Sequence, residues 1–273
     1  MIMHPFRLAL ENNMDIKQFN ELFSADVIFY SPILSIPVTG IDKTTILIYH
    51  MVNMGQSLKI TNEFQNGDQH LLLWNCRVND QLLEAATILV DDENGLIKEV
   101  RMFMGPWATL SLFVYGLNLG EVIVEQYWSA NKEWVGPVNY SLEYRQVNLA
   151  PEVILDIPFL TKSVVGKYAV QGTLDLLYSV MNRSGLTPLV ETRELQADLF
   201  KAEIDYFTME GLWITTCNEK GEITKLSILM NPWPMMTVLS NAARKLATKN
   251  KEYSFLTPDY WELPVSSFDM RNK

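Results

Sequence analysis

The sequence predicts an α+β protein made of two tandem domains, each with helices first and a meander of antiparallel strands after them. The main observation is an internal repeat of four landmark residues. The two numbers of every pair differ by 126: Pro32 and Pro158, Gly40 and Gly166, Gly95 and Gly221, Trp107 and Trp233. Solenoid repeats run to only about 50 residues, so each copy is better described as a small domain. We expect domains at 1–120 and 121–250 and a tail at 251–273.

The elements of the first copy follow from apolar spacing and turn residues. Apolar positions at helical spacing predict a helix over 5–23, interrupted near Asn12 and Asn13. Asp42 stands where a capping residue would begin the second helix. The order expected is helix 5–23, strand 27–30, helix 42–52, strand 68–75, strand 82–90, strand 96–104 and helix 107–117.

The second copy repeats this order with different side chains. The join and its first helical part are expected within 119–145. The elements that follow are strand 153–157, helix 174–181, strands 197–207, 212–217 and 223–230, and helix 235–247.

Composition limits the classes of partner. The chain has 22 Lys and Arg against 32 Asp and Glu, with a net charge of −10. An acidic chain lacks the basic footprint that nucleic acids and anionic membranes require. The longest apolar stretch, 107–119, is too short and too interrupted to span a bilayer. Cys76 and Cys217 occupy non-equivalent places in the repeat, which predicts two free thiols and a cytoplasmic protein.

Several short motifs of the first copy occur together in one known family. They are the helix end and strand at 22–34, the turn Pro37-Val38-Thr39-Gly40, Gly67-Asp68, and the turn at 92–97. In these motifs the sequence resembles the nuclear transport factor 2-like superfamily, especially its SnoaL-like polyketide cyclase and ketosteroid isomerase branches. The resemblance implies two cone-shaped domains, each a curved antiparallel sheet wrapped by helices around an apolar pocket. Many members dimerise sheet to sheet, so a tandem fusion implies an intrachain pseudo-dimer and a monomeric chain.

The acid and base groups of the ketosteroid isomerases are missing from both copies. Those enzymes place an Asp before the first-strand proline, a protonated Asp on a later strand and a Tyr on the first helix. The positions of the two carboxyl groups hold Ser31 and Thr87 in the first copy and Ile157 and Trp213 in the second, and Phe6 stands near the Tyr position. The resemblance therefore implies hydrogen bonding by Ser31, Tyr30 and Thr87 in place of carboxylate catalysis.

The predicted pocket of the first copy is apolar. Its candidate lining residues are Phe6, Leu10, Phe19, Phe29, Tyr49, Trp74, Met102, Met104 and Trp107. The bulky Trp213 is expected to fill the equivalent space in the second copy, so that the larger pocket lies in the first. Such a pocket suits a bulky apolar molecule.

Two functions remain open at this point. The first is a cofactor-independent cyclase or isomerase that acts on a polyketide-like molecule in secondary metabolism. The alternative is a non-catalytic protein of the same fold that binds a small molecule or serves as a scaffold. His4, His50 and His70 show no metal-ligand spacing, and the chain has no phosphate-binding loop. We therefore expect no metal, nucleotide or flavin.

Overall fold

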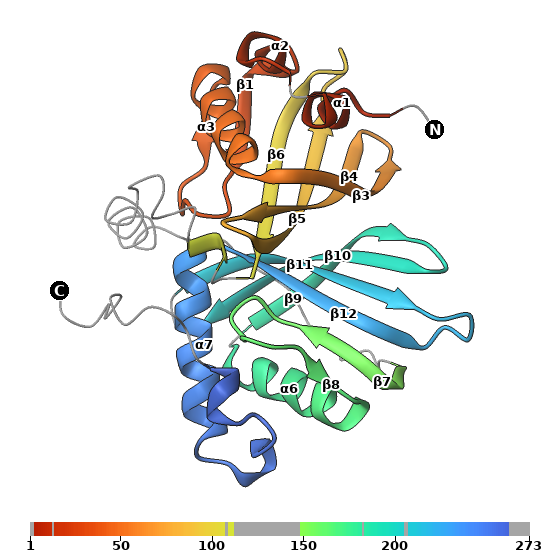
Figure 1. Cartoon of the computed structure of the whole chain (residues 1–273), viewed down its shortest axis with the longest axis vertical. Coiled ribbons are helices and arrows are strands. Elements are labelled where there is room, and N and C mark those ends of the chain that lie inside the picture. Colours follow the sequence, from red (N-terminus) through yellow and green to blue (C-terminus); the bar gives the residue numbers. More distant parts are fainter. Residues whose placement is uncertain are drawn as a thin grey trace, which may run out of the picture.

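The computed structural model describes residues 3–12, 14–106, 109–111, 148–181, 183–204 and 207–261 (Figure 1). The helix expected over 107–117 lies almost entirely outside the described residues, as do the boundary expected near 120 and most of the expected tail. Both cysteines are free thiols, as predicted. No helix in the described ranges is both long and apolar enough to cross a bilayer.

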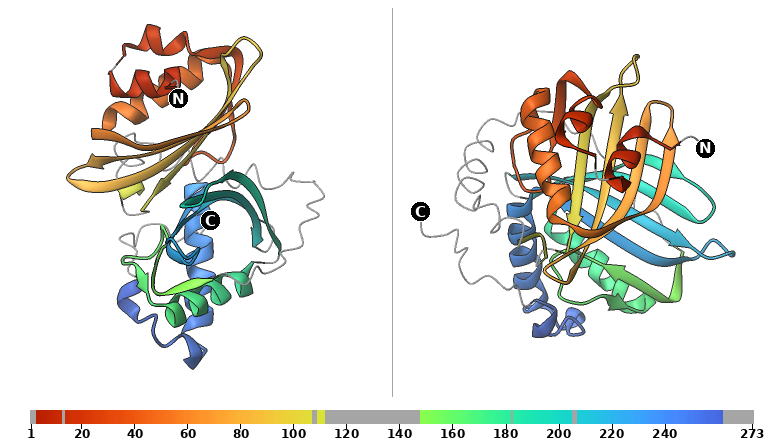
Figure 2. Two further views of the ribbon diagram at one scale, coloured as in Figure 1. Left: turned by 90° about the vertical axis from the view of Figure 1, so that its right-hand side faces the viewer. Right: turned by 45° about the horizontal axis from the view of Figure 1, so that its top comes forward.

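The first domain is a six-stranded sheet with three helices packed against one face. Its elements are α1 (Pro5–Glu11), α2 (Ile16–Asn20), β1 (Phe23–Tyr30), β2 (Val38–Thr39), α3 (Ile41–Met54), β3 (Gln56–Asn66), β4 (Gln69–Val78), β5 (Gln81–Asp91) and β6 (Ile97–Gly105). The strand order is β2-β1-β6-β5-β4-β3. The helices lie on the face turned away from the second domain (Figure 2).

The second domain repeats this topology. Its elements are β7 (Leu149–Asp156), β8 (Val164–Val165), α6 (Lys167–Val180), β9 (Arg183–Glu191), β10 (Leu195–Ile204), β11 (Phe207–Cys217), β12 (Ile223–Asn231), α7 (Trp233–Ala247), η1 (Lys251–Tyr253) and η2 (Pro258–Tyr260). The strand order β8-β7-β12-β11-β10-β9 matches that of the first domain strand for strand. The predicted duplication of one α+β unit is therefore confirmed.

The repeated glycines have a conformational reason. Gly40 and Gly166 precede equivalent helices with φ angles of 93° and 96°. Gly95 and Gly221 close equivalent turns with φ angles of 77° and 75°. Residues with a Cβ rarely adopt such angles, so these positions keep glycine in both copies.

Three details differ from the sequence prediction. Each sheet is mixed, because β1 pairs with β6 in parallel and β7 pairs with β12 in parallel. The strands β3 and β9 are not among the predicted elements. In β3 one face is entirely polar, and on the other Leu58, Ile60 and Phe64 are interrupted by Asn62, which hides the alternation of a strand. Gly40, and not Asp42, is the N-cap of α3, and Asp42 lies in the first turn.

The two sheets pack face to face, as the pseudo-dimer prediction required (Figure 1). An apolar cluster between them comprises Leu71, Ala86, Ile88, Phe103, Ala197, Leu212 and Leu229. Polar bonds join the same faces. The Asn231 side-chain amide donates to the Met102 carbonyl oxygen at 2.7 Å, and Arg101 pairs with Glu210 at 2.6 Å. The second domain thus supports the outer face of the first domain's sheet.

Candidate functional site

A cavity lies in the first domain, between its helices and the start of β3. Its volume is about 300 Å³. The lining residues come from α1, α2, α3 and the segments that follow α1 and α3, and they are Ala9, Leu10, Glu11, Met14, Phe19, Tyr49, Val52, Asn53, Gly55, Ser57 and Leu58. A volume of this size is at the lower end of the range of small-molecule sites.

Caps and aromatic contacts hold the three helices around this cavity. The His4 ring nitrogen Nδ1 accepts the Phe6 backbone N–H at the start of α1, and Asp15 and Gln18 form a capping box at the start of α2. The buried ring of Phe19 contacts Phe6, with centroids 5.4 Å apart, and Tyr49, with centroids 6.2 Å apart. Each helix is therefore fixed to the next by an aromatic ring.

Polar groups lie beside the apolar walls of the cavity. Asn53 donates its side-chain amide to the Tyr49 carbonyl oxygen at 2.8 Å. Glu11, the carboxylate among the lining residues, pairs with Arg7 at 2.9 Å. The lining thus combines apolar side chains with an exposed surface that is mostly polar and carries one charge.

The predicted pocket residues separate into two groups. Phe19, Tyr49 and Leu10 line the cavity. Five others belong to the fully packed core and do not line it, namely Phe6, Phe29, Trp74, Met102 and Met104. Trp107 lies outside the described residues. The interior of the cone is therefore filled by core side chains at these positions, and the open space lies nearer the helices.

The structure does not bring the three predicted catalytic hydroxyl groups to the cavity. The Thr87 hydroxyl oxygen accepts a hydrogen bond from the Trp74 indole at 2.9 Å. The Ser31 hydroxyl oxygen accepts the Ile33 backbone N–H at 3.3 Å in the turn after β1. The ring of Tyr30 lies under the Arg101 guanidinium, 3.8 Å from its centroid. In the folded chain the Thr87 and Ser31 hydroxyl groups and the Tyr30 ring each have a partner within the protein.

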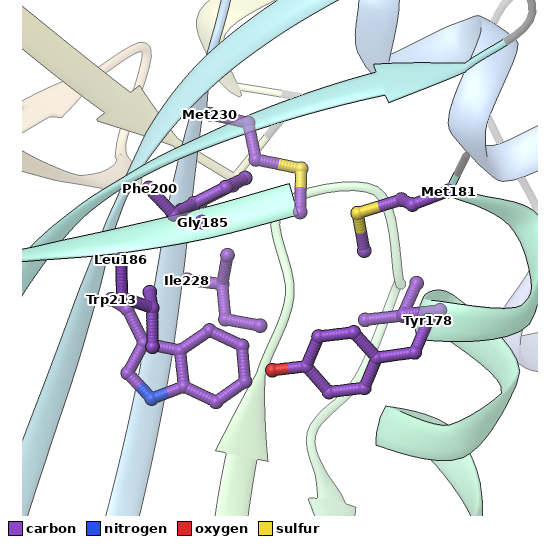
Figure 3. A pocket seen from close by; sticks show the side chains of 9 residues that line it. Tyr178, Met181, Gly185, Leu186, Phe200, Trp213, Ile228 and Met230 are labelled. Carbon is purple, nitrogen blue, oxygen red and sulfur yellow. The ribbon is translucent and has the colours of Figure 1, made fainter. Parts of the chain in front are cut away.

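The interior of the second domain is nearly closed at the positions equivalent to Trp74, Thr87, Met102 and Met104 (Figure 3). The pocket there has a volume of about 20 Å³, and Trp213 on β11 and Tyr178 on α6 face each other across it with ring centroids 6.4 Å apart. This is little more than the space of one water molecule. Burial raises the pKa of Tyr178. Of these two pockets the larger lies in the first domain, but the two are not at equivalent positions, so the predicted comparison of Thr87 with Trp213 stays untested.

A second group of polar residues was missed at the sequence level. His4, His70 and Asp91 lie together, with one ring nitrogen of each histidine and a carboxylate oxygen of Asp91 all within 4.8 Å of one another. The expectation of no metal, drawn from the sequence spacing of the histidines, stays a prediction. Sequence spacing could not reveal this set, because His4 and Asp91 are 87 residues apart.

Comparison with known proteins adds a likeness of fold. No protein-family model and no curated protein matches the chain. Solved structures do. They include a steroid delta-isomerase from Pseudomonas aeruginosa, with 17% identity over 47% of this chain and 90% of that chain and a TM-score of 0.38. A bacterial protein with a cystatin-like fold from Silicibacter pomeroyi matches at 19% identity over 48% of this chain and 94% of that chain, with a TM-score of 0.40.

A third solved structure is a hypothetical protein with a ketosteroid isomerase-like fold from Catenulispora acidiphila, in complex with trimethylamine. It matches at 15% identity over 38% of this chain and 85% of that chain, with a TM-score of 0.32. Other solved structures that the chain is similar to are described as NTF2-like. Each of the three matches above covers less than half of this chain. Likeness at this level describes the fold alone.

Proposed function

We propose that the first domain binds a small molecule with both apolar and polar groups in the cavity between α1, α2 and α3, and that the second domain is its structural support. The observation that carries the proposal is the cavity of about 300 Å³ between the helices of the first domain. The pocket beside Trp213 in the interior of the second domain has only about 20 Å³. The packed interface between the sheets explains why the second domain is needed.

The lining suggests the chemistry of the ligand. Leu10, Phe19 and Leu58 provide apolar surface for a hydrophobic body. Asn53 and Glu11 provide hydrogen-bonding groups at the same cavity. A molecule with an apolar ring system and one or two hydroxyl or carbonyl groups satisfies both kinds of surface.

The more specific hypothesis is a cofactor-independent cyclase or isomerase for a polyketide-like substrate in secondary metabolism. The observation that favours it is the presence of a carboxylate in the cavity, because Glu11 is a group that can accept a proton. In this form of the proposal, the cavity walls orient the substrate and Glu11 transfers the proton. The hydroxyl groups of Ser31, Tyr30 and Thr87 then act only if substrate binding rearranges the hydrogen bonds of Ser31 and Thr87 and the contact between Tyr30 and Arg101.

Binding is tested with a cavity-filling substitution. Val52 lines the cavity on α3, so Val52→Trp places an indole in the space of the ligand. Ile46→Trp is the matched control, because Ile46 is exposed on the same helix and does not line the cavity. With the fluorescent probe 8-anilinonaphthalene-1-sulfonate, we expect Val52→Trp to weaken binding at least about tenfold and Ile46→Trp to leave it unchanged. Equal binding by both variants would exclude this cavity as the site.

Catalysis is tested by incubating the protein with a panel of polycyclic ketones. Chromatography and mass spectrometry then detect products that have the mass of the substrate, as in isomerisation, or that mass less one water, as in cyclisation with dehydration. We expect turnover to be lost in Glu11→Gln while the fluorescent probe still binds. If turnover persists in Glu11→Gln but falls about 10- to 1000-fold in Thr87→Val or Ser31→Ala, the hydroxyl groups and not Glu11 are the catalytic groups. Binding of panel members without any product favours the binding function alone.

A further inference from the structure

Three strands and the start of α1 converge at one edge of the first domain. His70 on β4 lies opposite Leu89 on β5, and Asp91 is two residues beyond Leu89. Because strand side chains alternate between faces, His70 and Asp91 are diagonal neighbours on one face of the sheet. His4, the N-cap of α1, is tied to the same edge, since its backbone N–H donates to the Glu63 carboxylate on β3 at 2.8 Å.

We propose that His4, His70 and Asp91 form a binding site for a single Zn²⁺ ion, separate from the small-molecule cavity. The Asp91 atom Oδ2 lies 3.2 Å from Nε2 of His4 and 3.3 Å from Nε2 of His70. In a tetrahedral zinc site with bonds of 2.0–2.1 Å, neighbouring ligand atoms are about 3.3 Å apart. The spacing thus matches ligand atoms around an ion, and it is longer than about 2.8 Å, the usual length of a charge-assisted N–H to carboxylate bond.

The surroundings suit metal ligation by neutral imidazoles. The His4 and His70 side chains are only 3% and 10% exposed, and the Asp91 side chain is 16% exposed, so an ion can enter beside the carboxylate. Burial lowers the pKa of His4, an effect that Asp91 opposes. A neutral imidazole offers a lone pair to a metal, and one carboxylate supplies negative charge. Two imidazoles and a carboxylate are a ligand set that zinc accepts, with water in the fourth position.

The cap of α1 opposes metal binding and links the site to the helix. The Phe6 backbone N–H donates to Nδ1 of His4 at 3.1 Å, so the neutral ring carries its proton on Nε2. Coordination through Nε2 moves the ring proton to Nδ1, and the hydrogen bond to Phe6 is then lost. The loss of one N-cap bond lowers zinc affinity roughly fivefold, which is small beside the affinity that three ligands provide. Zinc binding therefore removes the side-chain N-cap hydrogen bond of α1, while the Leu8 backbone N–H still donates to the His4 carbonyl oxygen.

The test uses the full chain, treated with a chelator, passed through a desalting column and titrated with ZnCl₂ in a calorimeter at pH 7.5. We expect one ion per chain. Removal of one ligand by His70→Gln or Asp91→Asn is expected to weaken binding at least about 100-fold, beyond the range seen for outer-shell partners. His50→Gln is the matched control, because His50 is exposed on α3 and is not part of the set. It should bind zinc as the wild type does.

Co²⁺ provides a second readout, since tetrahedral coordination gives strong visible absorption that weakly bound surface ions do not give. The absorption is expected in the wild type and His50→Gln and not in Asp91→Asn. Circular dichroism checks that each variant is folded; Asp91→Asn preserves side-chain shape and carries the test if His70→Gln does not fold. Absence of zinc binding in the wild type, or binding that is equal in Asp91→Asn, would overturn the proposal.

Discussion

The Trp74 indole N–H donates a hydrogen bond of 2.9 Å to the Thr87 hydroxyl oxygen, and both side chains are buried. Thr87 stands where the family resemblance implied an oxyanion-binding group. In this chain it satisfies the polar atom of a neighbouring core residue. The equivalent positions of the second domain hold Phe200 and Trp213, so the two domains fill the same place with different pairs of side chains.

The first prediction concerns this hydrogen bond. Thr87→Val keeps the side-chain shape but leaves the buried indole N–H without its partner, and we expect the free energy of unfolding to fall by about 1–3 kcal/mol. Urea unfolding measures the change. Thr39→Val is the control, since Thr39 is exposed on β2, and its effect should stay within about 0.5 kcal/mol. Similar values for the two variants would show that the hydrogen bond contributes little.

The second prediction concerns Gly211, whose missing side chain leaves space for the Phe200 ring. Gly211 lies opposite Phe200 on the neighbouring strand, and a Cβ at this position would overlap the Phe200 ring and approach the Leu229 carbonyl oxygen. We expect Gly211→Ala to destabilise the chain by about 1–3 kcal/mol through overpacking. The thermal unfolding midpoint gives the measurement. Ala85→Gly, the reciprocal change at the equivalent cross-strand position of the first domain, should cost less, and a neutral Gly211→Ala would contradict the packing argument.

The third prediction concerns the bond between domains. Arg101 is 15% exposed and pairs with Glu210 of the second domain at 2.6 Å. We expect a double-mutant cycle with Arg101→Met and Glu210→Gln to give a coupling energy of about 1–3 kcal/mol. The exposed pair Lys98 and Asp68, with charged atoms 3.3 Å apart within the first domain, serves as the reference at about 0.5 kcal/mol or less. Equal coupling energies in the two cycles would show that the pair between domains stabilises the protein no more than an exposed pair does.

The fourth prediction concerns pH. Burial lowers the pKa of His4 from its ordinary value of 6.5, with a smaller contribution in the same direction from His70, while Asp91 and Glu63 oppose it. The unfolded chain therefore takes up this proton more readily. The stability contributed by neutral His4 is present above pH 6.5 and is lost as the pH falls below that value.

His4→Asn tests this prediction, because Asn retains an N-cap oxygen but does not titrate. We expect the loss of unfolding free energy between pH 7.5 and pH 5.5 to be smaller in His4→Asn than in the wild type. His50→Asn, at an exposed position, should show the wild-type dependence. If the unfolding free energy depends on pH in the same way in all three proteins, other titrating groups cause that dependence.

The duplication and the turns could be read directly from the sequence. Glycines at positive φ, such as Gly95 and Gly221, are required by local backbone geometry, so they recur at a constant interval in both copies. The strands β4, β5 and β6 were also predicted, because apolar residues and turn signals mark them. By contrast, β3 carries polar residues on both faces, and the hydrogen bonds to β4 that make it a strand come from long-range pairing.

The functional features depended on contacts between distant parts of the chain. Phe19 and Tyr49 were predicted to line a pocket and do so, but Phe29 and Met102 carry the same apolar signal and lie in the closed core. Hydrophobicity indicates burial, and whether a buried residue faces a cavity or another side chain depends on how the helices pack on the sheet. The meeting of His4 with Asp91 has the same cause, since strand register and the docking of α1 bring together two residues that have no local relationship.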